Sequence, residues 1–360
     1  MPFTSINYGT CTLPEGRLVT KKLLEVSIEG LGKIHKTSIF PCGIFQCMRG
    51  INRKPGDPNY DLYQLALQST AKRLYPNYAN VDWSNAARYD PNDPRTYFST
   101  MGCRTANLSD INADPGVNPQ MKDGRGNICP VTIILPTLAM MAEERAAIHN
   151  MDNGFDGSVI FADEVVDNFM ELLDKKIHEA KDMLIERFNW IASQDPSSAK
   201  FMYENNVMLG YKPEEGIRSA LKHGTLALGQ LGLAEALQIL IGKDHTTPEG
   251  MELAKRIEQL FKDRCAAFKR EYKLNFGVYF TPAENLCYTA LKKFRSKYGI
   301  IPNVSDKDFF TNSMHVPVWH KLSPFEKIDI ESQLTGYSSA GCITYVELDA
   351  SAIHNTAALE

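Results

Sequence analysis

Apolar residues recur at helical spacing in several long segments of the chain. The clearest stripe runs from about Asp163 to Ser193, where apolar side chains return every three or four residues. The segment 218–241 is rich in Leu, Ala and Gly, so a helix buried on most sides is expected there. Further helices are predicted over residues 13–32, 60–74, 247–272 and 281–299. In the last two, a Thr-Pro pair opens the helix, and Gly299 ends the final one.

Shorter apolar runs lie between these helices and predict strands. The run Ile128–Pro136 (ICPVTIILP) is continuous, which is typical of a strand buried on both faces. Strands separated by long helices favour an α/β protein with one continuous, barrel-like domain. The other predicted strands lie within residues 3–10, 38–48, 275–280, 311–318 and 341–348.

A long segment without clear periodicity extends from Tyr75 to Asn127. It contains the turn-forming stretches NPN, DPNDP and DPGVNP. Its aromatic residues, including Trp83 and Tyr97, argue against disorder, and a loop of this length in a compact domain is usually functional.

The composition narrows the classes of function. The chain has 43% hydrophobic and 23% charged residues and a formal net charge of −4, which gives no support for a nucleic-acid-binding surface. Its longest apolar run is too short for a membrane span, and its first residues lack the pattern of a signal peptide. The eight cysteines form no CxxC pair, so reduced thiols, a cytoplasmic location and no zinc ribbon are expected.

Cys103, in the irregular stretch STMGCRT, has no packing explanation. It lacks the histidine and asparagine pattern of a cysteine nucleophile and the second cysteine of a redox pair. The remaining interpretation is radical chemistry, in which a thiyl radical removes a hydrogen atom from a sugar carbon.

Two other stretches have both a structural and a chemical interpretation. In TPAE, Thr281 and Glu284 predict a capping box, and the same helix start offers free N–H groups to a phosphate. DGRGN is first of all a glycine-rich turn, but it also places Arg125 and Asn127 at the mouth of a barrel. Neither GxGxxG nor a P-loop motif is present.

The chain resembles, from end to end, the anaerobic (class III) ribonucleoside-triphosphate reductases, which are glycyl radical enzymes. No single sequence motif is sufficient for this resemblance. It is specific because the motifs occur together and in the same order as in the family. The matching phrases are SINYGT, PEGR, NYDLYQLALQSTAKRLYPNY, STMGCRT, DGRGN, ICPVTIILP, TPAENL, TNSMHVPV and ITYVEL.

The resemblance implies a ten-stranded α/β barrel threaded by a loop that carries the radical cysteine, here Cys103. That cysteine would abstract the ribose 3′-hydrogen, after which the 2′-hydroxyl leaves as water. Asn127 matches a family asparagine near the reacting ribose, and it joins Cys103 as a candidate catalytic residue. The candidate residues for binding the substrate phosphates are Thr281, Ala283, Glu284 and Asn285.

The resemblance also implies cofactors and partners that lie partly outside the chain. These are a glycyl radical on a residue beyond it, formate as reductant, ATP and dNTP effectors, a radical SAM activase and a homodimer of the complete enzyme. The family's ATP-cone, first strands and C-terminal zinc and glycyl radical segment are not found in this sequence. Residues 1–360 are therefore expected to form a single partial barrel domain, the central part of a catalytic subunit, with no metal site of its own.

Two alternatives stay open at this point. One is another glycyl radical enzyme of the formate-lyase or diol dehydratase type, which needs no nucleotide phosphate site. The other is an inactive fragment that binds nucleotide or assembles with a partner.

Overall fold

The computed structural model divides the chain into two compact units. Unit 1 comprises residues 1–106, 120–122 and 345–360, and unit 2 comprises residues 107–119 and 123–344. The structure describes residues 4–83, 89–128, 130–154, 161–205, 207–347 and 350–360.

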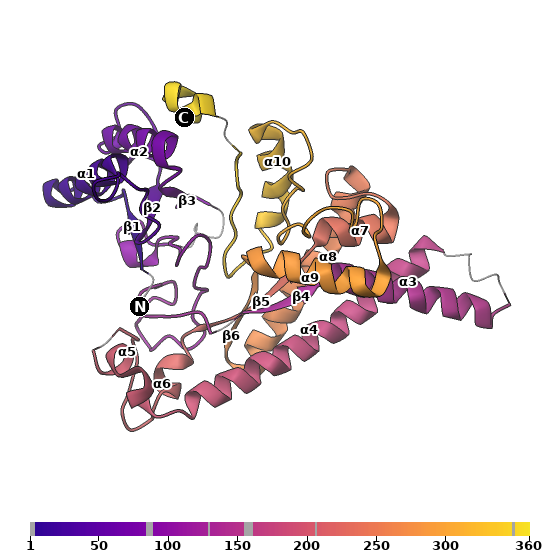
Figure 1. Cartoon of the computed structure of the whole chain (residues 1–360). Helices are drawn as coiled ribbons and strands as arrows, with labels where there is room; N and C mark the ends of the chain where they lie inside the picture. Colours follow the sequence, from indigo (N-terminus) through magenta and orange to yellow (C-terminus); the bar gives the residue numbers. More distant parts are fainter. Residues whose placement is uncertain (1–3, 84–88, 129, 155–160, 206, 348–349) are drawn as a thin grey trace. The chain divides into compact units, whose positions relative to one another are not determined.

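Unit 1 contains a parallel three-stranded sheet in the order β1-β2-β3, whose strands are joined by helices (Figure 1). Adjacent parallel strands require such crossover connections, because a tight turn cannot bring the chain back to the end of the sheet where the previous strand began. The elements are β1 (Ser5–Tyr8), α1 (Pro14–Glu29), β2 (Cys42–Cys47), α2 (Tyr60–Arg73) and β3 (Asn77–Asn80), with 3₁₀ turns at Pro94–Thr96, Ala350–His354 and Thr356–Leu359.

The two faces of this sheet have different neighbours. Phe45 of β2 packs with Leu24 of α1 and Leu62 of α2, so the two helices cover that face. Cys42 and Ile44 point to the other face, because side chains alternate along a strand, and Phe98 packs against them. The segment leading to Cys103 therefore lies on the face opposite the helices.

Unit 2 is built on a second parallel sheet, in the order β4-β5-β6, with β5 buried at every position. Its elements are β4 (Val131–Ile134), α3 (Leu135–Asp152), α4 (Ala162–Ala192), a 3₁₀ turn (Pro196–Ala199), α5 (Lys200–Glu204), α6 (Arg218–Leu221), β5 (Thr225–Leu231), α7 (Leu233–Ile241), α8 (Pro248–Tyr272), β6 (Asn275–Tyr279), α9 (Glu284–Tyr298) and α10 (Pro324–Thr335).

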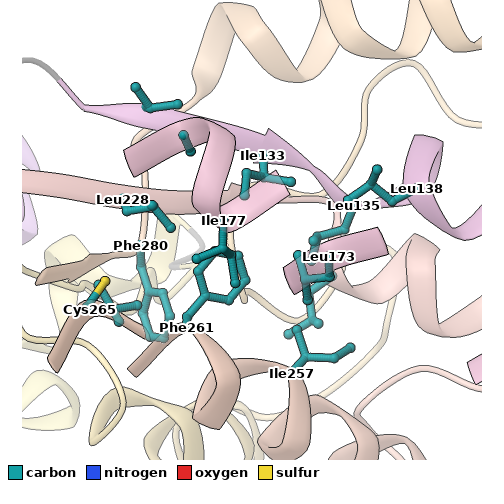
Figure 2. Packing of buried hydrophobic residues seen from close by; sticks show 14 of the residues in the cluster. Ile133, Leu135, Leu138, Leu173, Ile177, Leu228, Ile257, Phe261, Cys265 and Phe280 are labelled. Carbon is teal, nitrogen blue, oxygen red and sulfur yellow. The ribbon is translucent and has the colours of Figure 1, made fainter. Parts of the chain in front are cut away.

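The main core of unit 2 lies between its sheet and two long helices. Figure 2 shows Leu173 and Ile177 of α4 beside Ile257 and Phe261 of α8, with Leu228 of β5 in the same cluster. These side chains are fully buried, and each contributes about 1.5–3 kcal/mol of hydrophobic stabilisation. The apolar stripes predicted over Asp163–Ser193 and 247–272 are the faces that form this core, so both predicted helices are confirmed.

The helix expected over 218–241 is wrong. This segment forms the short helix α6, the central strand β5 and then helix α7. Gly232, which separates β5 from α7, adopts a left-handed φ of 77°. A continuous apolar run has no periodicity that distinguishes a buried strand from a buried helix, and the break therefore went unrecognised.

Two predicted strands are also absent from the described residues. Residues 311–318 and 341–347 have irregular backbone. The chain at the start of the second segment still bonds to β6 and the residue after it: Ala340 N–H donates to Val278 O (2.8 Å), and Gly341 O accepts from Phe280 N–H (3.2 Å). Helix α3 was not predicted, because it begins directly after β4 inside the same apolar run.

Both units thus show the expected α/β architecture with parallel sheets. The ten-stranded barrel and the single domain over 1–360 stay predictions. None of the described helices is long and apolar enough to cross a membrane. Among the described residues, no group of three His, Cys, Asp or Glu side chains is placed to hold a metal ion.

Candidate active site

Cys103 lies at the tip of a five-residue turn in unit 1. Met101 N–H donates to Thr105 O at 2.7 Å and closes the turn, and Gly102 has a φ of 65° that favours glycine. The thiol is free and partly exposed. The backbone before it is bonded to side chains of β1 and β2, so the sheet supports the turn.

The neighbours of Cys103 are a buried cation and a second thiol. Arg104 is fully buried; it donates from Nη2 to the hydroxyl of Tyr345 (2.7 Å), and its guanidinium lies 5.3 Å from the centre of that ring. Burial raises the pKa of the Cys42 thiol, and the proximity of Cys103 raises it further. Cys103 therefore lies close to a second thiol on this face of the sheet.

Asn127 lies in unit 2, at the amino end of the parallel sheet. The backbone around it pairs with Thr225, since Ile128 N–H donates to Thr225 O (2.7 Å) and Thr225 N–H donates to Gly126 O (2.8 Å). The Oδ1 atom of Asn127 is buried and has no hydrogen-bond partner among the residues that the structure describes. A buried acceptor without a partner is unfavourable, so this atom is suited to receive a bond from a ligand.

Arg125 has a structural role in this turn. Its guanidinium donates to the carbonyl oxygens of His223 and Leu108, each at 2.7 Å, and burial lowers its pKa. These contacts tie the DGRGN turn to two neighbouring segments. The placement of Arg125 at the mouth of a barrel stays a prediction.

Next to this turn lies a buried polar cluster that the sequence analysis did not predict. His223 Nδ1 lies 2.7 Å from Asp110 Oδ2, and Asn275 Nδ2 donates to Asp110 Oδ1 at 2.9 Å. Burial alone would raise the pKa of Asp110, but these hydrogen bonds lower it to about 2. The three residues are more than fifty positions apart, so no local motif signals the cluster.

The helix start at TPAE differs from the prediction. Helix α9 begins at Glu284, its N-cap residue is Ala283, and no side chain caps it. Thr281 instead accepts a hydrogen bond from the hydroxyl of Thr132 (3.0 Å), and Ala283 N–H donates to Asn312 Oδ1 (3.1 Å). The prediction of a capping box formed by Thr281 and Glu284 is therefore wrong. The first turn, which includes Glu284 and Asn285 on the exposed side, presents a positive dipole end without a side-chain cap.

The predicted site residues are divided between the two units. Cys103 belongs to unit 1, whereas Asn127 and the α9 start belong to unit 2. Asn127 lies level with Thr225, which pairs with Asn275. Thr281 lies against Gly229, which is four residues along β5 from Thr225, so at about 3.3 Å per residue Asn127 and Thr281 are about 13 Å apart along the strand direction. Only an extended ligand would contact both.

Comparison with known sequences identifies close counterparts. A family model described as anaerobic ribonucleoside-triphosphate reductase matches residues 1–360. The anaerobic ribonucleoside-triphosphate reductase of Escherichia coli K12 is 31% identical over all of this chain and 47% of its own length. That of phage T4 is 32% identical over 96% of this chain and 53% of its own length.

Solved structures show the same fold at lower identity. The anaerobic ribonucleotide reductase from Thermotoga maritima, with citrate in the active site, matches 99% of this chain and 60% of its own length with a TM-score of 0.64 and 16% identity. The glycerol-bound B12-independent glycerol dehydratase from Clostridium butyricum matches 94% of this chain and 46% of its own length, with a TM-score of 0.61 and 11% identity.

The chain spans about half the length of the curated relatives it matches. The family model nevertheless covers every residue, including the turn around Cys103, the DGRGN turn and the α9 start. The chain belongs to the anaerobic ribonucleoside-triphosphate reductase family.

Proposed function

We propose that this chain is the central part of the catalytic barrel of an anaerobic ribonucleoside-triphosphate reductase. The observation that carries the proposal is the family match over all 360 residues. The geometry adds a cysteine at the tip of a supported turn, on the sheet face opposite the helices. In the proposed enzyme, the parallel sheets of the two units belong to one ten-stranded barrel, and the rest of a longer protein supplies the other strands.

Cys103 is proposed to carry the reacting sulfur. As a thiyl radical it takes a hydrogen atom from the ribose 3′ carbon: an S–H bond forms, a C–H bond breaks, and the unpaired electron moves to carbon. The 2′-hydroxyl then takes up a proton and leaves as water, and formate supplies two electrons and leaves as carbon dioxide. The hydrogen atom held on Cys103 finally returns to the 3′ carbon, which completes the product and restores the thiyl radical. A glycyl radical outside this chain supplies the initial oxidation of the thiol.

Two sites in unit 2 are proposed to hold the substrate. Asn127 Oδ1, a buried acceptor without a partner, receives a bond from a ribose hydroxyl. The start of α9, with Thr281, Ala283, Glu284 and Asn285, receives the triphosphate at its positive end. The distance of about 13 Å between Asn127 and Thr281 along the strands requires an extended substrate, which a nucleoside triphosphate provides.

The complete enzyme is proposed to act as a cytoplasmic homodimer, with a radical SAM activase and ATP or dNTP effectors. The Thermotoga maritima relative has been solved in complex with dATP and CTP, which supports a nucleotide substrate and effector here. Effector binding would use regions outside this chain.

The proposal is tested by turnover of ribonucleoside triphosphates under anaerobic conditions. The chain is completed with the remaining segments of a relative, activated and supplied with formate. Cys103→Ala and Cys103→Ser should abolish product formation, whereas Cys11→Ala, at an exposed thiol, should leave it unchanged. Retained turnover in Cys103→Ala would contradict the assignment of the thiyl radical.

The alternatives give other results in the same assay. A diol dehydratase would convert glycerol and leave nucleotides unchanged; the likeness to glycerol dehydratase concerns the fold alone. A chain with only a binding or assembly role would give no turnover after completion with any segment.

A further inference from the structure

Three polar side chains of unit 1 hold the backbone that leads to Cys103. Ser5 and Asn7 lie on β1 and Gln46 lies on β2. The register pairs Ser5 with Cys42 and Asn7 with Ile44, which places all these side chains on the face opposite α1 and α2. A polar row on this face needs partners, because Gln46 is only 7% exposed.

Asn7 makes the most specific of these contacts. Its Nδ2 donates to Thr100 O at 3.0 Å, and its Oδ1 accepts from Thr100 N–H at 3.2 Å. The side-chain amide thus binds both backbone groups of one residue, as a neighbouring strand would. Asparagine is suited to this because it carries a donor and an acceptor in one plane.

Two further bonds flank this clamp. Gln46 Nε2 donates to Phe98 O at 3.0 Å, and Gly102 N–H donates to Ser5 Oγ at 2.8 Å. Every second residue from Phe98 to Gly102 is therefore bonded to the sheet by a side chain. The last of these bonds lies on the residue directly before Cys103.

We propose that Asn7, supported by Ser5 and Gln46, is a positioning residue that sets the place of the Cys103 sulfur. This inference rests on the function proposed above. Asn7 touches Thr100 and acts on the thiol only through the backbone of the turn. Hydrogen-atom transfer needs the sulfur and the carbon in near contact, and a displacement of about 1 Å reduces such a rate by roughly 10²-fold.

The variants Asn7→Leu and Asn7→Asp separate the two halves of the clamp. Leucine has a similar shape and removes both bonds, whereas aspartate keeps an acceptor for Thr100 N–H and sets a carboxylate oxygen against Thr100 O. Asn80→Ala is the matched control, because this exposed asparagine of β3 accepts from the nearby Asp82 N–H and, within the described part of the chain, makes no hydrogen bond to the turn around Cys103.

The first measurement is the alkylation rate of Cys103 by iodoacetamide in the intact chain, followed by mass spectrometry. Loss of the clamp in Asn7→Leu should raise this rate about 30-fold, because two hydrogen bonds are lost. The rate should be unchanged in Asn80→Ala. A Cys103 rate within about twofold of the parent chain in both Asn7 variants would overturn the proposal.

The second measurement is turnover of the completed, activated enzyme. Asn7→Leu should lower kcat by about 10²-fold, leave KM unchanged and increase the isotope effect with 3′-deuterated substrate. If Asn7→Leu fails to fold, Ser5→Ala replaces it, with a smaller effect of the same kind. An unchanged kcat in Asn7→Leu, together with an inactive Cys103→Ala, would refute the positioning role and leave the proposed function intact; an active Cys103→Ala would refute the function itself.

Discussion

Arg104 and Tyr345 are joined by a hydrogen bond of 2.7 Å across 241 positions of the chain. The guanidinium also lies over the tyrosine ring. The residue after Cys103 is therefore fixed by the C-terminal part of unit 1, while the residues before it are fixed by β1 and β2. The turn is held on both sides of the thiol.

Replacement of this tyrosine tests the second support. Tyr345→Phe removes a hydrogen bond to a charged donor, so the free energy of unfolding of unit 1 should fall by about 1.5–3 kcal/mol. Tyr345→Ala should lower it further, because the cation–π contact is lost as well. Urea denaturation followed by circular dichroism measures both. Tyr288→Phe, at an exposed tyrosine, serves as the control and should have no effect; equal stability of Tyr345→Phe and the parent chain would contradict the role of the hydroxyl.

Asn127→Ala should separate function from stability. The buried Oδ1 atom has no hydrogen-bond partner, so its removal should change the free energy of unfolding by less than about 1 kcal/mol. Turnover of the completed enzyme should fall by about 10–100-fold, because the proposed bond to the ribose is lost. Asn275→Ala is the contrasting variant: it removes a partner of buried Asp110, and we expect a loss of stability of about 1–3 kcal/mol. An Asn127→Ala chain that is as destabilised as Asn275→Ala would indicate a structural role.

The buried pair of Glu258 and Gln230 should make the stability of the fold depend on pH. Gln230 Nε2 donates to Glu258 Oε1 at 2.8 Å, while Gln230 Oε1 and Glu258 Oε2 are both buried without partners. A proton on Glu258 would remove the charge that burial disfavours. Burial raises the pKa of Glu258 from 4.5 to about 8, although the bond from Gln230 opposes this shift.

The folded chain therefore keeps a proton between pH 4.5 and about 8 that the unfolded chain releases. The free energy of unfolding falls as the pH rises through this window, by up to about 1.4 kcal/mol per pH unit. Glu258→Gln imitates the protonated acid and should remove this part of the dependence in denaturation curves measured at several pH values. Glu252→Gln, at an exposed position of the same helix, should keep it. A pH profile of Glu258→Gln that matches the parent chain would show that Glu258 is charged in the fold.

Gly229 permits the close approach of the segment before α9. A Cβ atom at this position would overlap Thr281 Oγ1 and the backbone oxygen of Tyr279. Gly229→Ala should lower the free energy of unfolding by about 1–3 kcal/mol through overpacking, and it should weaken triphosphate binding by shifting Thr281. Calorimetric titration with a ribonucleoside triphosphate measures the second effect in the completed enzyme. Gly336→Ala, where a Cβ meets nothing within 4 Å, is the control and should change neither quantity appreciably; unaltered binding in Gly229→Ala would argue against Thr281 as part of the phosphate site.

The sequence by itself determined the elements whose pattern is local. The stripes of α4 and α8, the helices α1 and α2 and the strands β1, β2 and β6 follow from periodicity, because one buried face imposes a repeat on the residues that form it. Cys103 became a candidate because it lies outside such a pattern. The Thr-Pro start of α8 also held, with Thr247 accepting from Gly250 N–H.

Only the tertiary structure decided the partners of these residues. Strand β5 is central in its sheet, and a strand buried on all sides shows the same apolar run as a buried helix. Thr281 was expected to cap α9 but bonds to Thr132, 149 positions away. The clamp between Asn7 and Thr100 joins residues 93 positions apart, and the pair of Asp110 and Asn275 joins residues 165 positions apart. Hydrogen bonds over such separations depend on how the sheets and loops pack, and they leave no periodic trace in the order of the amino acids.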